Sequence, residues 1–169
     1  MDAIAFTRFY KRKRMPVYQL KRQQKLPSSI GEVWEFISKP ENLSKITPEA
    51  MEFRILTREL PDKIYPGMII SYRVRPLLRL KMNWVTEITH VEDNRYFVDE
   101  QRHGPYTLWH HEHFVESIDG GVLMTDIITY KPPGGILGGL ANRLFIRRQL
   151  RQIFDYRFVA LENRFGIYP

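Results

Sequence analysis

The chain has 169 residues, of which 43% are hydrophobic and 13% aromatic, and it contains no cysteine. That length and apolar content suit one domain with one sizeable core. The absence of cysteine excludes disulfides and thiolate metal sites and favours a reducing compartment, so we expect a cytoplasmic protein. The formal net charge of +7 is compatible with nucleic acid, anionic lipid or an acidic small molecule. Because no helix-turn-helix, RNA-binding aromatic motif or zinc finger accompanies that charge, we do not expect nucleic-acid binding.

We expect two regions, a basic tail over residues 1–15 and a single domain over residues 16–169. The tail carries the basic tract from Lys11 to Arg14 and mixes aromatic with basic residues without a period. This composition predicts a flexible or loosely docked arm, whose charge would suit a transient contact with anionic membrane. No apolar run reaches the roughly twenty residues of a membrane span, and residues 1–16 lack the apolar stretch of a secretory signal.

The first part of the domain reads as one strand and two short helices. Alternation over residues 17–26 predicts the strand, which Pro27 ends. Ser29 followed by Glu32 has the spacing of a capping box and predicts a helix that Pro40 stops, with a second short helix in residues 41–46. From residue 51 the period changes from helical to alternating, which predicts six more strands. These strands fall in residues 52–60, 67–76, 80–93, 95–104, 105–117 and 122–131.

The segment from residue 134 to residue 165 predicts one long amphipathic helix, because its apolar residues recur at steps of mostly three or four. The apolar side comprises Leu137, Leu140, Leu144, Leu150, Phe154, Phe158, Leu161 and Phe165. The opposite side is basic, with Arg143, Arg147, Arg148, Arg151, Arg157 and Arg164. The helix needs a partner surface, and the alternating segments supply it. We therefore predict an α+β domain in which a sheet lies across this helix.

Two blocks of residues carry a resemblance to a known superfamily. The first is F-V-D-E-Q-x-x-G-P-Y-x-x-W-H-H-E-H-F from Phe97 to Phe114, and the second is D-I-I-T-Y-K-P-P-G-G from Asp126. With the order of elements, they resemble the helix-grip superfamily of START-like and SRPBCC-type proteins, including pollen-allergen carriers and polyketide cyclases, over residues 16–165. The blocks are similar to a bacterial subgroup often labelled cell-division inhibitors. The resemblance implies a curved seven-stranded antiparallel sheet gripping the C-terminal helix around an internal cavity, in a superfamily of carriers, enzymes and regulators.

Three consecutive strands have one face that mixes aromatic with ionisable residues. Charged or polar residues share one parity, as with Glu100 and Arg102, His110 and Glu112, and Thr125 and Thr129, so that parity is placed in solvent. The opposite parity then faces the helix, and together with residues of the first strand and the helix it forms the candidate ligand-binding site. This set is Tyr18, Arg22, Phe97, Asp99, Gln101, Trp109, His111, His113, Asp126, Ile128, Tyr130 and Phe154. Apolar walls with a polar end are the form expected of a small-molecule site, and Arg22 would supply a counter-charge to an acidic ligand.

Two structural alternatives stay open for this face. A bulge would invert the parity, leaving His111 and His113 in solvent and Leu108 and Phe114 inside. Alternatively, the His and Asp side chains satisfy one another as a buried polar network without binding anything.

We expect binding of a hydrophobic or aromatic small molecule, with no cofactor. The alternative is a cyclase- or hydratase-like enzyme with His111, His113 and Asp126 as candidate catalytic residues, in which a His–Asp pair acts as general base and Tyr130 or His113 as proton donor. A third hypothesis is a regulatory protein-interaction module that uses the face of Arg147, Arg148 and Arg151.

An H-x-H spacing with an acidic neighbour also suits a metal, but only if the three side chains converge, and we expect none. The glycine-rich segment over residues 132–139 lacks the Lys or Ser/Thr of a phosphate-binding loop, and its glycines fit tight packing of the helix start or a mobile lid. The loop with Leu77 and Leu78 between Arg75 and Arg79 either covers the cavity or touches a membrane.

Overall fold

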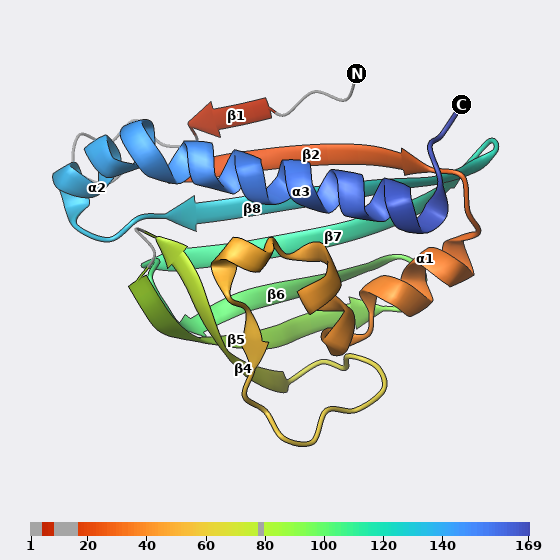
Figure 1. Ribbon diagram of the computed structural model, residues 1–169, viewed down its shortest axis with the longest axis horizontal. Helices are drawn as coiled ribbons and strands as arrows, with labels where there is room; N and C mark the ends of the chain where they lie inside the picture. The colour runs from red at the N-terminus through yellow and green to blue at the C-terminus, as the bar shows by residue number, and fades with distance from the viewer. Residues whose placement is uncertain (1–4, 9–16, 78–79) are drawn as a thin grey trace.

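A single antiparallel sheet dominates the computed structural model, which describes residues 5–8, 17–77 and 80–169 (Figure 1). The strand order is β1-β2-β8-β7-β6-β5-β4-β3. The strands are β1 (Ala5–Arg8), β2 (Tyr18–Leu26), β3 (Arg54–Ile55), β4 (Met68–Leu77), β5 (Leu80–Glu92), β6 (Tyr96–His103), β7 (Leu108–Ile118) and β8 (Gly121–Lys131). The seven strands expected for a helix-grip sheet are present, and β1 pairs with β2 as an eighth at the edge.

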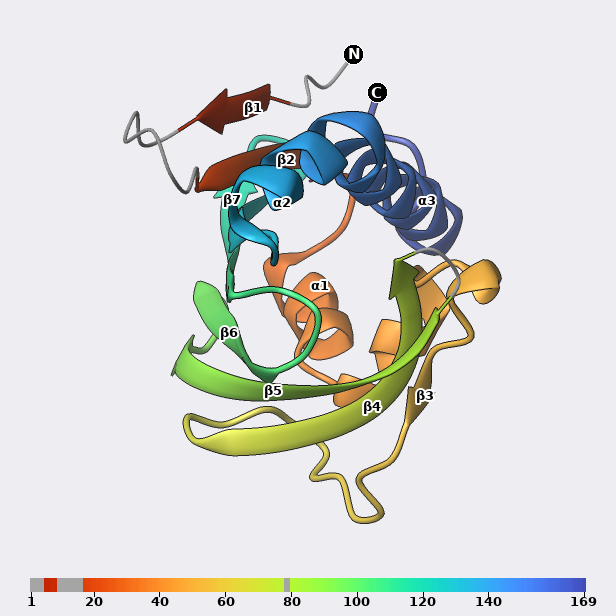
Figure 2. The ribbon, with the colours of Figure 1, turned by 90° about the vertical axis from the view of Figure 1, so that its left-hand side faces the viewer.

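The helices lie on the concave side of this sheet. They are α1 (Ile30–Ile37), the 3-10 helices η1 (Pro40–Ile46) and η2 (Glu49–Met51), α2 (Gly135–Ala141), the π-helical turn η3 (Asn142–Ile146) and α3 (Arg147–Phe165). Viewed along α3, the sheet forms an arc with α1 inside it and α3 across its open side (Figure 2). The α3 helix packs on β2 and η1, whereas α1 packs on β7 and β8, so helices cover two parts of the concave face. The predicted helix-grip fold is confirmed.

Local chemistry explains where α1 begins. The Ser29 hydroxyl accepts a hydrogen bond from the Glu32 amide at 3.3 Å, and the Glu32 carboxylate accepts one from the Ser29 amide at 3.2 Å. This reciprocal capping box is the one predicted from the spacing of the two residues, and it satisfies two amides at the helix start. The helix then buries Val33 and Trp34 against the sheet.

One predicted strand is much shorter than its sequence pattern suggests. Alternation predicted a strand over residues 52–60, but only Arg54 and Ile55 pair with β4. The next two amides, of Leu56 and Thr57, both donate to the carbonyl of Ser71, which breaks the regular ladder. Glu52, just before the strand, has a φ of 44° and turns the chain out of η2. The result is a minimal edge strand, which offers little free edge to another chain.

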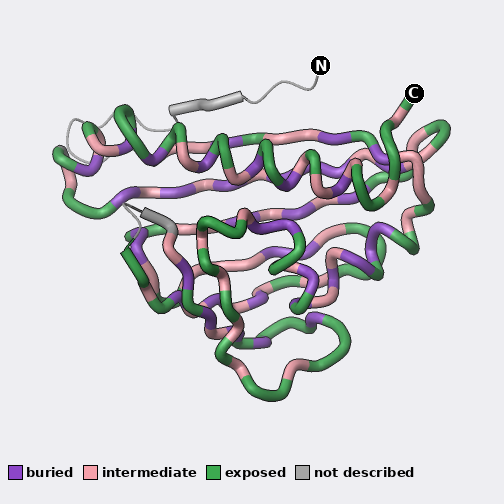
Figure 3. Tube along the Cα trace, viewed as in Figure 1, coloured by how far each residue is buried: buried purple, intermediate pink, exposed green. Residues whose placement is uncertain are grey.

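The predicted long helix is present but is not one uninterrupted amphipathic α-helix. Leu150, Phe154 and Leu161 are buried as predicted, and buried residues recur along α3 in Figure 3. The prediction is wrong for the first turns, because Leu137, Leu140 and Leu144 are exposed, at 76%, 55% and 54%. The π-helical turn accounts for part of this error, since an extra residue within one turn rotates the residues before it relative to those after it.

At the π-helical turn, other residues than the predicted leucines are buried. Asn142 and Ile146 are buried, and the Tyr130 hydroxyl donates to Asn142 Oδ1 at 2.9 Å. Close backbone contact anchors α2, because a Cβ at Gly138 would lie 2.0 Å from the Pro133 carbonyl oxygen. The glycine-rich segment therefore serves tight packing at this position, as one of its two predicted roles requires.

Some sequence predictions fall on parts of the chain outside the described residues. The basic tract from Lys11 to Arg14 and the loop residues 78–79 are among them. Residues 5–8 of the predicted tail form β1, whose Cα partners in β2 run from Tyr18 to Lys21. In the described part of the chain, no helix combines the length and apolar composition needed to cross a bilayer.

Candidate functional site

A cavity of about 170 Å³ lies between the concave face of the sheet and α3. Its walls are largely aromatic and aliphatic, and its aromatic residues include Phe36, Phe53, Tyr72, Trp84, Phe97, Tyr106, Trp109 and Phe154. The rings pack on one another, with Trp84 edge-on to Trp109 at a centroid distance of 5.2 Å and stacked on Tyr72 at 6.0 Å. These mutual contacts hold the wall in place without a ligand.

Ionisable side chains gather at one side of this cavity, where Asp99, His111 and His113 all line it. His111 and His113 are 4% and 6% exposed, so the predicted inward parity is correct and the bulge alternative is wrong. Thr125 is the exception on the outer face, since it is buried and accepts a hydrogen bond from Gln23 Nε2 at 3.1 Å.

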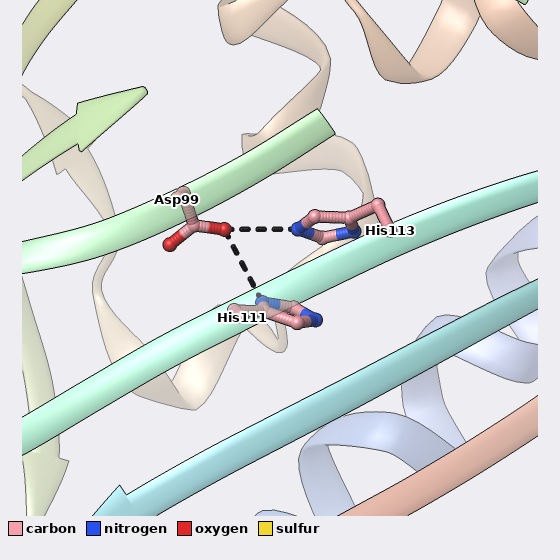
Figure 4. Close-up of side chains that lie close together, drawn as sticks. All are labelled: Asp99, His111 and His113. Atoms are coloured by element: carbon pink, nitrogen blue, oxygen red, sulfur yellow. Dashed lines mark hydrogen bonds and ion pairs between the residues drawn. The ribbon is translucent and has the colours of Figure 1, made fainter. Parts of the chain in front are cut away.

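The sheet register brings the two histidines between two aspartates. In the sheet, Asp99 on β6 is the Cα partner of His111, and Asp126 on β8 is the partner of His113. Asp99 Oδ2 lies 3.3 Å from His111 Nδ1 and 2.9 Å from His113 Nε2 (Figure 4). On the other side, Asp126 Oδ1 lies 3.1 Å from His111 Nε2 and 2.9 Å from His113 Nδ1. Each imidazole therefore places both ring nitrogens against carboxylates.

Opposing effects set the charge state of this His–Asp cluster, defined as Asp99, His111, His113 and Asp126. Burial alone would raise the pKa of the Asp99 carboxyl, but the charge and hydrogen bonds of the two imidazoles outweigh it and hold that pKa well below its usual value. The same balance, with Arg157 contributing, lowers the pKa of Asp126. Burial would lower the pKa of His113, yet hydrogen bonds to Asp126 and Asp99 raise it overall. The cluster thus keeps its carboxylates ionised and attracts positive charge.

Arg157 completes this side of the cavity, although it was predicted on the basic side of the helix, opposite the apolar residues. It is 7% exposed, its Nη1 donates to Asp126 Oδ1 at 3.4 Å, and its guanidinium lies 4.8 Å from the Phe154 ring centroid. Its Nε has no acceptor among the described residues. A buried arginine that lines a cavity with one unpaired donor can hydrogen-bond an incoming oxygen.

A second polar group sits in the aromatic wall. The Thr86 hydroxyl lies 2.7 Å from the Tyr72 hydroxyl and accepts from Trp84 Nε1 at 3.0 Å. Burial raises the pKa of Tyr72, which keeps its hydroxyl protonated. Tyr72 on β4 and Trp84 and Thr86 on β5 all point inward. The alternation that identified the inner face of β6, β7 and β8 therefore predicts these three residues as well.

Half of the predicted site residues line the cavity and half do not. Those that do are Phe97, Asp99, Trp109, His111, His113 and Phe154. Those that do not are Tyr18, Arg22, Gln101, Asp126, Ile128 and Tyr130. Asp126 still acts on the site through the two imidazoles, whereas Ile128 is a fully buried core residue.

The other side chains that do not line the cavity have structural partners of their own. Arg22 lies over the Phe158 ring and pairs with Asp155 at 3.5 Å. Gln101 bonds the backbone of Tyr106, with its Nε2 donating to the carbonyl at 2.6 Å. The Tyr130 hydroxyl donates to Asn142, and burial raises the pKa of Tyr130 to about 12. Its hydroxyl is therefore engaged away from the cavity, which counts against Tyr130 as a proton donor there.

The spacing of Arg157 from its apolar neighbours in the sequence indicates that it faces the core. Phe154, Arg157 and Leu161 follow one another at steps of three and four, which places them on one helix face. The prediction that all six arginines of the helix lie on the side opposite the apolar residues is therefore wrong for Arg157. The structure shows that the spacing was the better guide at this position.

No protein-family model matches the chain, and no curated protein sequence does. Solved structures match it in fold. They include TTHA0849 from Thermus thermophilus, with a TM-score of 0.65 and 17% identity, covering 86% of this chain and 95% of that chain. Ara h 8.0201 gives a TM-score of 0.61 and 13% identity over 88% and 97% of the two chains. CalU16 from Micromonospora echinospora gives 0.59 and 10% over 97% and 88%.

These structural neighbours share the helix-grip fold that the resemblance in the sequence implied. At such low identities the likeness establishes the fold alone. The similarity to a subgroup labelled cell-division inhibitors stays a prediction, and the function has to be argued from the site.

Proposed function

We propose that the protein binds a small hydrophobic or amphipathic molecule in the cavity between the sheet and α3. The single observation that carries this proposal is the composition of the cavity wall, in which aromatic rings surround one ionisable side formed by Asp99, His111, His113 and Arg157. An apolar chamber with a few convergent polar groups is the usual form of a ligand site. The helix-grip fold is consistent with this use.

The volume and the polar side restrict the class of ligand. A cavity of about 170 Å³ is close to the roughly 150 Å³ at which an engineered apolar cavity binds benzene, so one aromatic ring or a short acyl chain fits without rearrangement. The ring would lie against Trp84 and Trp109. An oxygen of the ligand, such as a carboxylate oxygen, would accept from the unpaired Nε of Arg157. In this proposal the free Nε of Arg157 donates the hydrogen bond to the ligand, a role that was expected of Arg22.

The test uses two neighbouring residues of β4. Ile70 lines the cavity and is 6% exposed, whereas Ile69 points outward and is 48% exposed. Ile70→Trp fills the cavity and should weaken binding of a panel of one-ring acids, benzoate and its ring-substituted forms, by at least about tenfold, the loss expected when an apolar pocket is blocked. Ile69→Trp is the matched control and should bind as the native protein does. Equal binding by both variants, measured by fluorescence, would contradict the proposal.

A second measurement asks what the protein carries when purified. Native mass spectrometry followed by solvent extraction should release one small organic molecule from the native protein. Trp109→Ala, which removes a wall of the cavity, should carry less of it. Extracts without any organic molecule, together with no binding from the panel, would overturn a carrier role.

A cyclase- or hydratase-like enzyme is the second candidate, and the carboxylate-held imidazoles that line the cavity favour it. His111→Gln separates the two functions. An enzyme should lose turnover by orders of magnitude while retaining affinity for its ligand, whereas a carrier should change in affinity only modestly. The measurement compares the mass of the ligand before and after incubation with each protein.

We also propose that the ligand is exchanged at an anionic bilayer. The protein would dock on that bilayer through an exposed apolar surface at the start of its C-terminal helix. We call this surface the leucine patch and define it as Leu137, Leu140, Leu144 and Phe145, which are 54% to 76% exposed. Arg143 and Arg148 are exposed beside it. Large apolar side chains flanked by arginines are the composition that binds an anionic interface. The basic excess of the whole chain acts in the same direction.

A further inference from the structure

The His–Asp cluster contains a set of metal ligands that the sequence could not show to converge. We infer that Asp99, His111 and His113 form a site for one divalent first-row transition-metal ion, such as Zn²⁺ or Fe²⁺. One ligand atom from each of the three residues lies within 4.8 Å of the others. Two imidazoles and one carboxylate are a donor set that such ions favour, and a three-residue set leaves coordination positions open.

The sheet holds these ligands in place. His111 and His113 alternate on β7 and therefore project from the same face, and Asp99 lies directly opposite His111 on the hydrogen-bonded neighbour β6. In Figure 4 the ring nitrogens of both histidines point toward the same carboxylate. Asp99 Oδ2 is 3.3 Å from His111 Nδ1 and 2.9 Å from His113 Nε2, separations that ligand atoms sharing one ion can have. Ligands on strands are positioned more exactly than ligands on loops.

Asp126 supplies the outer support that metal-bound histidines normally have. It lies 3.1 Å from His111 Nε2 and 2.9 Å from His113 Nδ1, the two nitrogens that face away from Asp99. If both of those nitrogens carry the proton and donate to Asp126, His111 Nδ1 and His113 Nε2 are left as lone-pair donors toward Asp99. Arg157 in turn holds Asp126 at 3.4 Å. One aspartate thus acts as a ligand and the other positions both imidazoles.

Charge and access agree with a cation at this point. The two aspartates carry two negative charges, and Arg157 offsets only one of them when the imidazoles are neutral. Within the described part of the chain, Asp99 makes its ion pairs with the two imidazoles and with no lysine or arginine. The three proposed ligands line the cavity and Asp126 does not, so open coordination positions would face the cavity. An oxygen of a bound small molecule could take one of them.

The competing explanation is that protons alone balance the buried carboxylates, giving an imidazolium network without a metal. The two explanations differ in whether the folded protein takes up an ion. The site can be tested with the metal alone, because none of the four residues needs an organic ligand to be in place. A protein that takes up metal but no organic ligand would refute the proposed function and leave this inference standing, and the reverse outcome would do the opposite.

The experiment starts from the full chain, stripped with a chelator and dialysed. Titration with Co²⁺, followed by visible absorption, and with Zn²⁺, followed by calorimetry, should each end at one equivalent. His111→Gln, His113→Gln and Asp99→Asn should abolish this uptake. His110→Gln is the matched control, because His110 neighbours His111 on β7 but faces outward, where its Nδ1 lies 3.0 Å from Glu100. It should bind as the native protein does.

Asp126→Asn tests the positioning role, and it should weaken Zn²⁺ binding about 10- to 100-fold without changing the stoichiometry. Circular dichroism melting of each variant shows whether it folds. If a ligand variant does not fold, proton NMR of the Co²⁺-loaded native protein decides, because two strongly shifted exchangeable imidazole signals are expected. No uptake of either metal by the native protein, absence of those signals, or equal uptake by a folded His111→Gln variant would each overturn the site.

Discussion

The C-terminal helix has two halves, residues 135–146 and α3, and their large apolar residues lie in opposite environments. In α3, Leu150, Phe154 and Leu161 are at most 3% exposed, whereas Leu137 and Leu144 before it are more than half exposed. Composition alone would predict the reverse, since residues 135–146 hold six large apolar residues and one arginine, whereas α3 holds five arginines. The difference is in what lies beneath, because α3 packs on β2 and η1 and closes the cavity.

The comparison shows that helical periodicity predicts a stripe of residues but not how far its partner surface extends. The π-helical turn from Asn142 to Ile146 separates the two halves. Apolar surface left in water costs stability that a purely structural helix would avoid, and we attribute the leucine patch to the proposed membrane contact. The following predictions test how sharply the two halves differ, beginning with the largest expected change in stability.

Truncating the buried half should unfold the protein most easily. Phe154→Ala removes a ring that is 3% exposed and should lower the free energy of unfolding by about 3–5 kcal/mol. Leu144→Ala, in the other half, should change it by less than about 0.5 kcal/mol. Urea unfolding followed by circular dichroism measures both. Similar losses in the two variants would mean that the leucine patch is packed in solution and would remove the contrast.

The arginines of the two halves should differ in the same way. Arg157→Met keeps apolar contact with Phe154 but leaves Asp126 without its guanidinium, and we expect a loss of about 2–3 kcal/mol. This is below the cost of a fully unpaired buried charge, because Asp126 keeps both imidazoles. Arg143→Met removes an exposed charge and should cost less than about 0.5 kcal/mol. If Arg157→Met leaves the free energy of unfolding unchanged in the same urea assay, the buried pair of Arg157 and Asp126 is not needed for stability.

The alternation of the strands and the capping box were enough to predict the sheet, α1 and the inward direction of His111 and His113. These features depend on neighbours along the chain, which a single sequence displays. The convergence of Asp99 with both histidines depends instead on the register between β6 and β7, and that register cannot be predicted from the alternation of residues in each strand. The sequence could therefore name the ligands of the proposed metal site but could not show that they meet.

The errors have a common physical origin. Arg22 was predicted to face the ligand, but Asp155 on α3 pairs with it first. Leu137 was predicted to be buried, but α2 extends past its packing surface. Each outcome depends on which tertiary partner is present, and residue type and spacing leave that partner undetermined.

The junction between the halves should show an intermediate effect. Asn142 is 2% exposed and accepts the Tyr130 hydroxyl, so Asn142→Ala leaves a buried donor unpaired and should cost about 1–3 kcal/mol. Tyr130→Phe in the same background removes that donor and should recover part of the loss. A double-mutant cycle in urea measures the coupling. Strictly additive effects would show that this hydrogen bond does not hold the π-helical turn on β8.

The smallest change in stability should accompany a large change in membrane binding. Replacing Leu140 and Leu144 together by serine removes two side chains that are just over half exposed, so the free energy of unfolding should stay within about 0.5 kcal/mol of native. Binding to vesicles rich in phosphatidylglycerol, measured by co-flotation, should fall at least about tenfold, because two apolar anchors are lost.

Val159→Ser is the matched control for this experiment, because Val159 is 53% exposed and lies on α3, outside the leucine patch. It should bind vesicles as the native protein does. Because arginines contribute to the contact, binding of the native protein to anionic vesicles should weaken as the salt concentration rises. Binding to vesicles of phosphatidylcholine alone should be weak. If Val159→Ser loses as much binding as the double serine variant, the contact is diffuse. If neither variant changes binding to anionic vesicles, the leucine patch has no role in docking, and its exposure needs another partner.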